Sequence, residues 1–153
     1  MSASCKLVVG SGYLGQRVAR EWARAGHRVV VTTRAADRAR TLAKQGFEAL
    51  VLDVTQPGSL APIRHLPALD TLLYAVAYDR QGGISRRQIT VEGISNMLDA
   101  VHNLAGRLIY VSTSGVFGQK HGEWIDESSP CAPQREAGIA YLEAERRVTA
   151  HRW

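Results

Sequence analysis

The chain of 153 residues is long enough for one domain with a substantial core, and 45% hydrophobic with 22% charged residues argues against a disordered chain. No apolar run approaches the length of a membrane span and the N-terminus lacks a signal-peptide pattern, so we expect a cytoplasmic location. The net charge of +5 comes mostly from arginines spread along the chain, which makes nucleic-acid binding an unfavoured hypothesis. The two cysteines, Cys5 and Cys131, lack the spacing of a metal site, so we expect free thiols and no metal.

The first predicted elements surround a glycine-rich turn. A short β-branched run leads into Gly10, Gly12 and Gly15, and an amphipathic helix follows. We expect Gly10 to permit a sharp turn, Gly12 to let the backbone approach a diphosphate, and Gly15 to allow close packing of helix on strand. Tyr13 and Leu14 lie where the turn passes into the helix, whose free N–H groups suit phosphates, so we expect both residues at the site too. This context favours a dinucleotide site over a turn without a ligand.

Strands and helices then alternate with the spacing of βαβ units. We predict an α/β, Rossmann-type, doubly wound parallel sheet in a single domain over residues 1–153, with strand order 3-2-1-4-5. The ligand crevice is expected where the order reverses between the first and fourth strands, and Ala75 and Val76 should line it. The predicted strands cover 6–9, 29–33, 47–52, 71–76 and 107–112, and the predicted helices cover 14–25, 35–44, a short one from 57 toward 65, 85–103 and 136–151.

The end of the second strand indicates which dinucleotide binds. The acidic residue that binds the ribose 2′-hydroxyl of NAD is absent, and Arg34 stands there with Arg38 one helical turn further on. A guanidinium suits a 2′-phosphate, so we favour NADP over NAD, although an arginine at a strand end also fits an ordinary surface position. Asp53 and Val54 should lie near the adenine, with a helix-cap or turn role for Asp53 as the alternative.

Four segments carry a family resemblance: residues 10–15, 52–55, 91–100 and 110–118, the last reading Tyr-Val-Ser-Thr-Ser-Gly-Val-Phe-Gly. They resemble the short-chain dehydrogenase/reductase superfamily, in particular the extended and atypical members of its NAD(P)-dependent epimerase/dehydratase branch. The resemblance implies a domain that binds NAD(P)(H) and transfers a hydride to or from a carbonyl or alcohol, with a nucleotide sugar as one option.

The resemblance also implies catalytic residues and shows a departure. It gives the hydroxyl of Thr113, three residues before Val116, the task of binding the substrate oxygen; the alternative is a hydroxyl that only satisfies the loop backbone. The family pair Tyr-x-x-x-Lys is not found, because Tyr141 is followed by Glu145 and alignment on Glu145 puts Ala137 at the tyrosine position. Tyr141 is either a catalytic tyrosine in a rebuilt site or, as we favour, an ordinary helix residue.

Two hypotheses follow from this departure. The chain is either an oxidoreductase or epimerase-like hydride-transfer domain with an unidentified small-molecule substrate, or a catalytically inactive dinucleotide-binding sensor or regulatory protein. Family members continue past the last helix, so we expect the C-terminal substrate region to be missing. The edge of the strand over 107–112 would then be open, in a piece of a longer protein or in a homo-oligomer whose second copy covers it.

Overall fold

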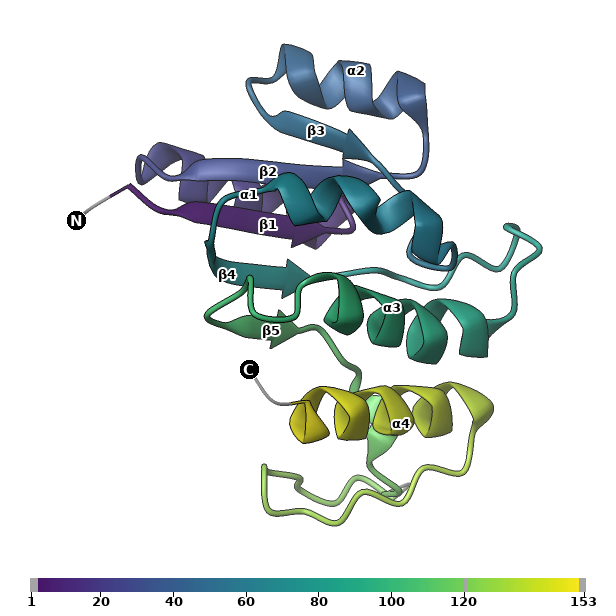
Figure 1. Ribbon diagram of the computed structural model, residues 1–153. Helices are drawn as coiled ribbons and strands as arrows, with labels where there is room; N and C mark the ends of the chain where they lie inside the picture. Colours follow the sequence, from purple (N-terminus) through teal and green to yellow (C-terminus); the bar gives the residue numbers. More distant parts are fainter. Residues whose placement is uncertain (1–2, 120, 152–153) are drawn as a thin grey trace.

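The computed structural model describes residues 3–119 and 121–151, which form a parallel five-stranded sheet with helices on both faces (Figure 1). The strand order is β3-β2-β1-β4-β5, so the predicted Rossmann-type topology is confirmed. The strands are β1 (Cys5–Val9), β2 (Arg28–Thr33), β3 (Glu48–Val51), β4 (Leu69–Tyr74) and β5 (Leu108–Tyr110). The helices are α1 (Tyr13–Arg24), α2 (Ala36–Lys44), η1 (Pro57–His65), η2 (Gln88–Glu92), α3 (Gly93–Ala100), η3 (Ser114–Val116) and α4 (Glu136–Ala150).

The central strand β1 pairs in parallel with β2 on one side and with β4 on the other. Leu7, Val8 and Val9 are fully buried, as expected for a strand covered on both faces. Their side chains alternate between two cores. Leu7 and Val9 join the larger core with Ile94 and Met97 of α3, and Val8 joins the smaller core on the opposite face, where α1 and α2 lie. The carboxyl ends of β1 and β4 therefore meet between two covered faces.

Most predicted boundaries differ from the structure by one or two residues, and the larger differences lie in the second half of the chain. β4 ends at Tyr74, although the N–H of Ala75 still donates to the Val9 carbonyl at 2.8 Å. β5 spans only Leu108–Tyr110, shorter than predicted.

The long helix predicted over 85–103 is divided into the π-helical η2 and the α-helix α3, and it ends at Ala100. A left-handed Asn103, with φ of 59°, lies in the turns that follow, a conformation that asparagine tolerates. Inside the helix, a Cβ at Gly93 would lie 2.8 Å from Val54 Cγ2, so this glycine lets the helix approach the loop after β3. The sequence periodicity revealed neither the division of the helix into η2 and α3 nor the close approach at Gly93.

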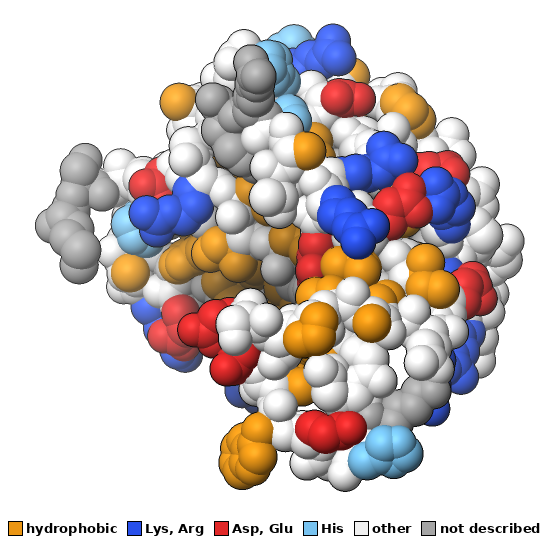
Figure 2. Space-filling view, turned by 90° about the horizontal axis from the view of Figure 1, so that it is seen from below, with side chains coloured by type: hydrophobic (Ala, Val, Ile, Leu, Met, Phe, Trp, Pro, Cys, Tyr) orange, Lys and Arg blue, Asp and Glu red, His pale blue; other side chains and the backbone are white. Residues whose placement is uncertain are grey.

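The sheet ends at β5, which pairs with β4 and leaves Ile109 43% exposed. Beyond this edge lie α4 and the loop that precedes it (Figure 1). Figure 2 shows this end of the molecule, where hydrophobic side chains gather in a hollow. In the described part of the chain, no helix is long and apolar enough to cross a membrane, and the cytoplasmic location stays a prediction.

Candidate functional site

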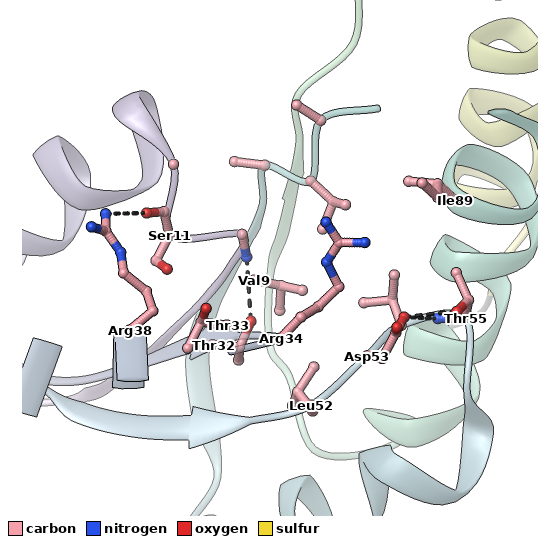
Figure 3. A pocket seen from close by; sticks show the side chains of 16 residues that line it. Val9, Ser11, Thr32, Thr33, Arg34, Arg38, Leu52, Asp53, Thr55 and Ile89 are labelled. Carbon is pink, nitrogen blue, oxygen red and sulfur yellow. Dashed lines mark hydrogen bonds between the residues drawn. The ribbon is translucent and has the colours of Figure 1, made fainter. Parts of the chain in front are cut away.

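A cavity of about 380 Å³ opens at the carboxyl ends of β1, β2, β3 and β4, where the crevice was predicted (Figure 3). Eight of the predicted site residues line it: Gly10, Gly12, Arg34, Arg38, Asp53, Val54, Ala75 and Val76. The remaining lining residues are Val9, Ser11, Thr32, Thr33, Leu52, Thr55, Ala77 and Ile89.

The glycine turn forms one wall of this cavity, and each glycine has a different geometric reason. Gly10 adopts φ of 95°, and a Cβ there would lie 2.6 Å from the Ala75 carbonyl oxygen. A Cβ at Gly15 would lie 2.1 Å from the Gly10 carbonyl oxygen, so this glycine lets α1 approach the turn and the strand. A Cβ at Gly12 would meet nothing within 4 Å, which leaves its backbone open toward the cavity.

Thr32, near the end of β2, fastens the glycine turn in place. Its hydroxyl accepts from the Gly10 N–H at 3.3 Å, and its carbonyl accepts from the Ser11 N–H at 3.3 Å. The Gln16 side-chain amide donates to the Ser11 carbonyl at 2.8 Å. These bonds hold the turn against β2, and the first N–H groups of α1 have no partner inside the helix. Backbone donors and the positive end of the helix dipole form an anion-binding arrangement at the cavity.

Two arginines project into the same cavity, Arg34 from the position after β2 and Arg38 from α2 (Figure 3). The Arg38 guanidinium lies beside the glycine turn and donates to the Ser11 carbonyl at 3.4 Å. Arg34 follows β2 directly and reaches toward the loop after β4, where its Nη2 lies 3.6 Å from Asp79 Oδ2. Arg34 and Asp79 side chains are both 49% exposed, so this ion pair is weak and a stronger anion can replace the carboxylate.

The opposite wall is built by the loop after β3. One carboxylate oxygen of Asp53 accepts from the Thr55 N–H at 2.9 Å and from the Thr55 hydroxyl at 2.7 Å (Figure 3). Asp53 thus has the turn role that the sequence left open, and it lines the cavity as well. The N-cap position of η1 is occupied by Gln56, so Asp53 is not its helix cap.

Three predicted cofactor residues lie outside the lining of this cavity. Tyr13 and Leu14 are 77% and 44% exposed at the start of α1, and the Tyr13 ring lies under the Arg17 guanidinium at 4.3 Å. Gly15 is buried against the turn. Contact between these residues and a cofactor stays a prediction, and in the case of Tyr13 and Leu14 it would involve the backbone.

Sequence reasoning missed the role of Thr32, although a polar residue at the end of a buried apolar strand is a detectable signal. Thr32 is only 2% exposed, and its hydroxyl is used by the glycine turn. Ile89 was missed because its place at the cavity depends on the π-helical η2, which no sequence pattern indicated.

A second cavity, of about 490 Å³, lies between the loop after β5 and α4. Its lining residues are Ser112, Thr113, Ser114, Val116, Phe117, Glu127, Cys131 and Glu145. The Thr113 hydroxyl accepts from the Gly115 N–H at 3.2 Å, which is the backbone role that the sequence left as an alternative. The same hydroxyl keeps its own proton for another partner.

Two glycines in the segments around this second cavity mark close contacts, although neither lines the cavity. A Cβ at Gly138 would lie 2.1 Å from the Gly115 carbonyl oxygen, and a Cβ at Gly118 would lie 2.6 Å from the Ala132 carbonyl oxygen. The Arg87 guanidinium also donates to the Glu143 carboxylate at 2.8 Å, which lowers the pKa of Glu143 and joins α4 to the turn before η2.

Tyr141 lies on α4 next to Tyr110, with ring centroids 6.5 Å apart, and it is not a lining residue of either cavity described above. Tyr110 in turn stacks on Tyr74 at 5.8 Å. Burial raises the pKa of the Tyr74 and Tyr110 phenols, and the neighbouring tyrosines add to the shift. The three rings form a packed row, and a catalytic role for Tyr141 stays a prediction. Within residues 3–119 and 121–151, no group of His, Cys, Asp and Glu is placed to hold a metal ion.

Comparisons with solved structures agree with this architecture. A protein from Methylobacillus flagellatus described as an NAD-dependent epimerase/dehydratase is 33% identical, with a TM-score of 0.77 over 98% of this chain and 52% of that one. The ADP-L-glycero-D-manno-heptose-6-epimerase of Helicobacter pylori is 19% identical, with a TM-score of 0.79 over 97% of this chain and 51% of that one. WbmG of Bordetella bronchiseptica, solved with NAD and UDP, is 21% identical, with a TM-score of 0.79 over 97% of this chain and 50% of that one.

The last two likenesses show the fold alone, and the chain spans about half the length of these proteins. A comparison with curated protein sequences finds no match. The sequence pattern of the NAD dependent epimerase/dehydratase family matches residues 7–152, nearly the whole chain. The predicted resemblance is therefore confirmed, and the chain belongs to the NAD dependent epimerase/dehydratase family.

Proposed function

We propose that this chain binds NADP(H) in the cavity at the glycine turn and forms the cofactor-binding part of a hydride-transfer protein. The observation that carries the proposal is the joint lining of one cavity by Gly12, Arg34 and Arg38. The residues fit a dinucleotide, because an open glycine backbone, a helix N-terminus and two guanidinium groups face the same space. The family is NAD-dependent, which supports dinucleotide binding in general, and the arginines support the phosphorylated form.

The chain's own residues would divide the work as follows. Backbone N–H groups at Gly12 and the start of α1 would bind the diphosphate, and Arg34 and Arg38 would bind the 2′-phosphate. The bound cofactor supplies the hydride acceptor or donor. Thr113, whose hydroxyl proton is free, would donate to a substrate carbonyl oxygen at the second cavity.

Titration calorimetry with NADPH and separately with NADH tests this proposal. Arg34→Ala and Arg38→Ala should weaken NADPH binding by about tenfold or more, because a charge-assisted hydrogen bond contributes about 1.5–3 kcal/mol. NADH binding should change little in Arg34→Ala. Arg40→Ala is the matched control, because Arg40 lies on the same helix and pairs with Asp37 outside the cavity lining.

Two results would count against the proposal. Absence of binding of either cofactor at millimolar concentration would remove the dinucleotide claim. If NADH binds more tightly than NADPH, and Arg34→Ala changes both affinities equally, NAD and not NADP is the cofactor.

A catalytically inactive dinucleotide sensor or regulatory protein is the second candidate. It is favoured by the position of Tyr141, which packs against Tyr110 and leaves the second cavity without a phenol among its lining residues. Cofactor binding without turnover across a panel of aldehydes, ketones and nucleotide sugars would support the sensor. Turnover that survives Tyr141→Phe and is lost in Thr113→Ala would support the hypothesis that the chain is an enzyme, and the compound that is turned over would identify its substrate class.

We also propose that a second copy of the chain covers the β5 edge, where Ile109 is 43% exposed. Sedimentation velocity should then show a dimer that Ile109→Lys separates into monomers. A monomeric wild type would refute this assembly.

A further inference from the structure

The second cavity places three hydroxyl-bearing residues and two carboxylates around one space. Ser112, Thr113 and Ser114 follow β5, and Glu127 and Glu145 come from the loop before α4 and from α4 itself. Among the lining residues that the structure describes, none is a lysine, arginine or histidine. The chain as a whole carries a net charge of +5, so the local charge of this cavity opposes the overall charge.

Hydrogen bonds fix the polarity of two neighbouring hydroxyls. The Ser112 hydroxyl donates its proton to the Glu145 carboxylate, since an ionised carboxylate can only accept. Lone pairs of Ser112 remain for a further donor. The Thr113 hydroxyl accepts from the Gly115 N–H at 3.2 Å and keeps its proton for a further acceptor. The pair therefore presents one acceptor and one donor side by side, which matches an alcohol or a carbonyl next to an alcohol.

The carboxylates add a selection by charge. An anionic group placed near Glu127 and Glu145 would meet two like charges, and the described lining residues include no cationic side chain to offset them. At about 6 Å, the dielectric constant of water and physiological salt, where charges are screened over about 8 Å, each carboxylate changes the local concentration of a unit charge by about twofold. The ratio of cation to anion therefore changes by about three- to fourfold per carboxylate, and by more in a less polar environment. A neutral hydroxyl group is not repelled, and an ammonium group is attracted.

We propose that the second cavity admits the hydroxyl-bearing or amine-bearing, uncharged or cationic end of a substrate and excludes an anionic one. This inference rests on the proposed function, because it takes the group at Thr113 to be the reacting end of the substrate. It narrows the substrate class to neutral or amino polyols and excludes compounds that carry a carboxylate or phosphate at the reacting end.

Cys131 provides a reporter inside the cavity itself. Its thiol is exposed and lines the cavity, and Cys5 is buried in β1. Three methanethiosulfonate reagents carry aminoethyl, hydroxyethyl or sulfonatoethyl groups and so differ in charge. In each reaction the thiolate sulfur forms a disulfide with the reagent sulfur and methanesulfinate leaves. Mass spectrometry follows the reaction rate of each reagent at Cys131. Each rate is divided by the rate of the same reagent with N-acetylcysteine amide, which removes differences in intrinsic reactivity between the reagents. A ratio between two reagents is then independent of the fraction of Cys131 that is thiolate.

We expect the normalised ratio of the cationic to the anionic rate to be about tenfold or higher. Glu127→Gln and Glu145→Gln should each lower this ratio by about threefold or more, and the glutamine oxygen at position 145 can still accept from Ser112. Glu21→Gln is the control, because Glu21 lies on α1 over the opposite face of the sheet. Salt at about 1 M should reduce the wild-type ratio toward one.

A normalised ratio at or below one in the wild type would overturn the proposal, and so would a ratio that neither glutamine substitution changes. If the Glu145→Gln protein fails to fold, the rate ratio in Glu127→Gln and the salt dependence of the wild-type ratio test the proposal. The NADPH titration is read separately. Cofactor binding with a ratio at or below one would refute this inference alone, whereas an absence of cofactor binding would remove the proposed function and the substrate assignment with it.

Discussion

Gly12, at the N-cap of α1, and Gly15, in its first turn, should respond differently to replacement by alanine: one substitution should weaken binding and the other should lower stability. At Gly15, a Cβ would lie 2.1 Å from the Gly10 carbonyl oxygen and 3.1 Å from Val8 Cγ1, so backbone must move. Overpacking of a buried site costs about 1–3 kcal/mol, and contact with rigid backbone places Gly15→Ala at the upper end, about 3 kcal/mol. For a domain of this size, that loss lowers the melting temperature by about 6–12 °C.

Gly12→Ala should leave the fold intact and impair binding. Gly12 has φ of −75° and ψ of −159°, which alanine adopts freely, and its Cβ would meet nothing within 4 Å. Replacing a glycine N-cap by alanine costs less than about 1 kcal/mol, and the stiffer unfolded chain offsets about 0.4–1 kcal/mol of that. The net change in the free energy of unfolding is within about 0.5 kcal/mol, whereas the added methyl group keeps a diphosphate from the backbone and weakens NADPH binding by about tenfold or more.

Differential scanning calorimetry and titration calorimetry on both variants decide this pair. An unchanged melting temperature in Gly15→Ala would show that the close approach of α1 to the turn is not tight. Full NADPH affinity in a stable Gly12→Ala protein would show that the diphosphate does not lie against this backbone, and the reasoning about the turn would be refuted.

Three further variants probe other parts of the structure. Gly138→Ala should lower the free energy of unfolding by about 3 kcal/mol, because a Cβ there would lie 2.1 Å from the Gly115 carbonyl oxygen. Chemical denaturation measures this loss, with Gly58→Ala as the control because a Cβ at Gly58 would meet nothing within 4 Å. An equal loss of unfolding free energy in both variants would contradict the packing. Asp79→Asn should strengthen NADPH binding by about two- to fivefold, because Arg34 loses a competing partner, and calorimetry showing weaker binding would argue against that competition. Burial raises the pKa of Tyr74, so on raising the pH the unfolded chain loses the tyrosine proton first, and the free energy of unfolding should fall above about pH 10. Denaturant unfolding from pH 8 upward should show a shallower fall of this free energy in Tyr74→Phe than in the wild type. The same pH dependence in both proteins would contradict the raised pKa.

Much of the fold was predictable because local signals and topology agree. The run Leu7–Val9 is buried on both faces, and the glycines after it fit a strand–turn–helix unit and no other element, so the sheet order followed from the alternation. The positions of Arg34, Arg38 and Asp53 at one cavity also followed, because parallel strands bring their carboxyl ends to the same edge.

What the sequence could not show depends on contacts between distant segments. The hydrogen bond from Ser112 to Glu145 joins residues 33 positions apart, and neither residue indicates the other by its spacing. The Arg34–Asp79 pair depends on the course of the loop after β4. Tyr13 and Leu14 were placed at the cofactor by their neighbours in sequence, but the first turn of a helix directs its side chains outward there and leaves both exposed.

The central claim is that a dinucleotide lies across the turn over residues 10–15 and reaches Arg34. Amide chemical shifts of the ¹⁵N-labelled chain, recorded during titration with NADPH, test it most directly. We predict the largest changes at Gly10, Gly12 and the first turn of α1, with further changes at Thr33–Arg34 and Asp53–Val54. Shifts confined to other surfaces, or a spectrum that NADPH leaves unchanged at millimolar concentration, would contradict the account.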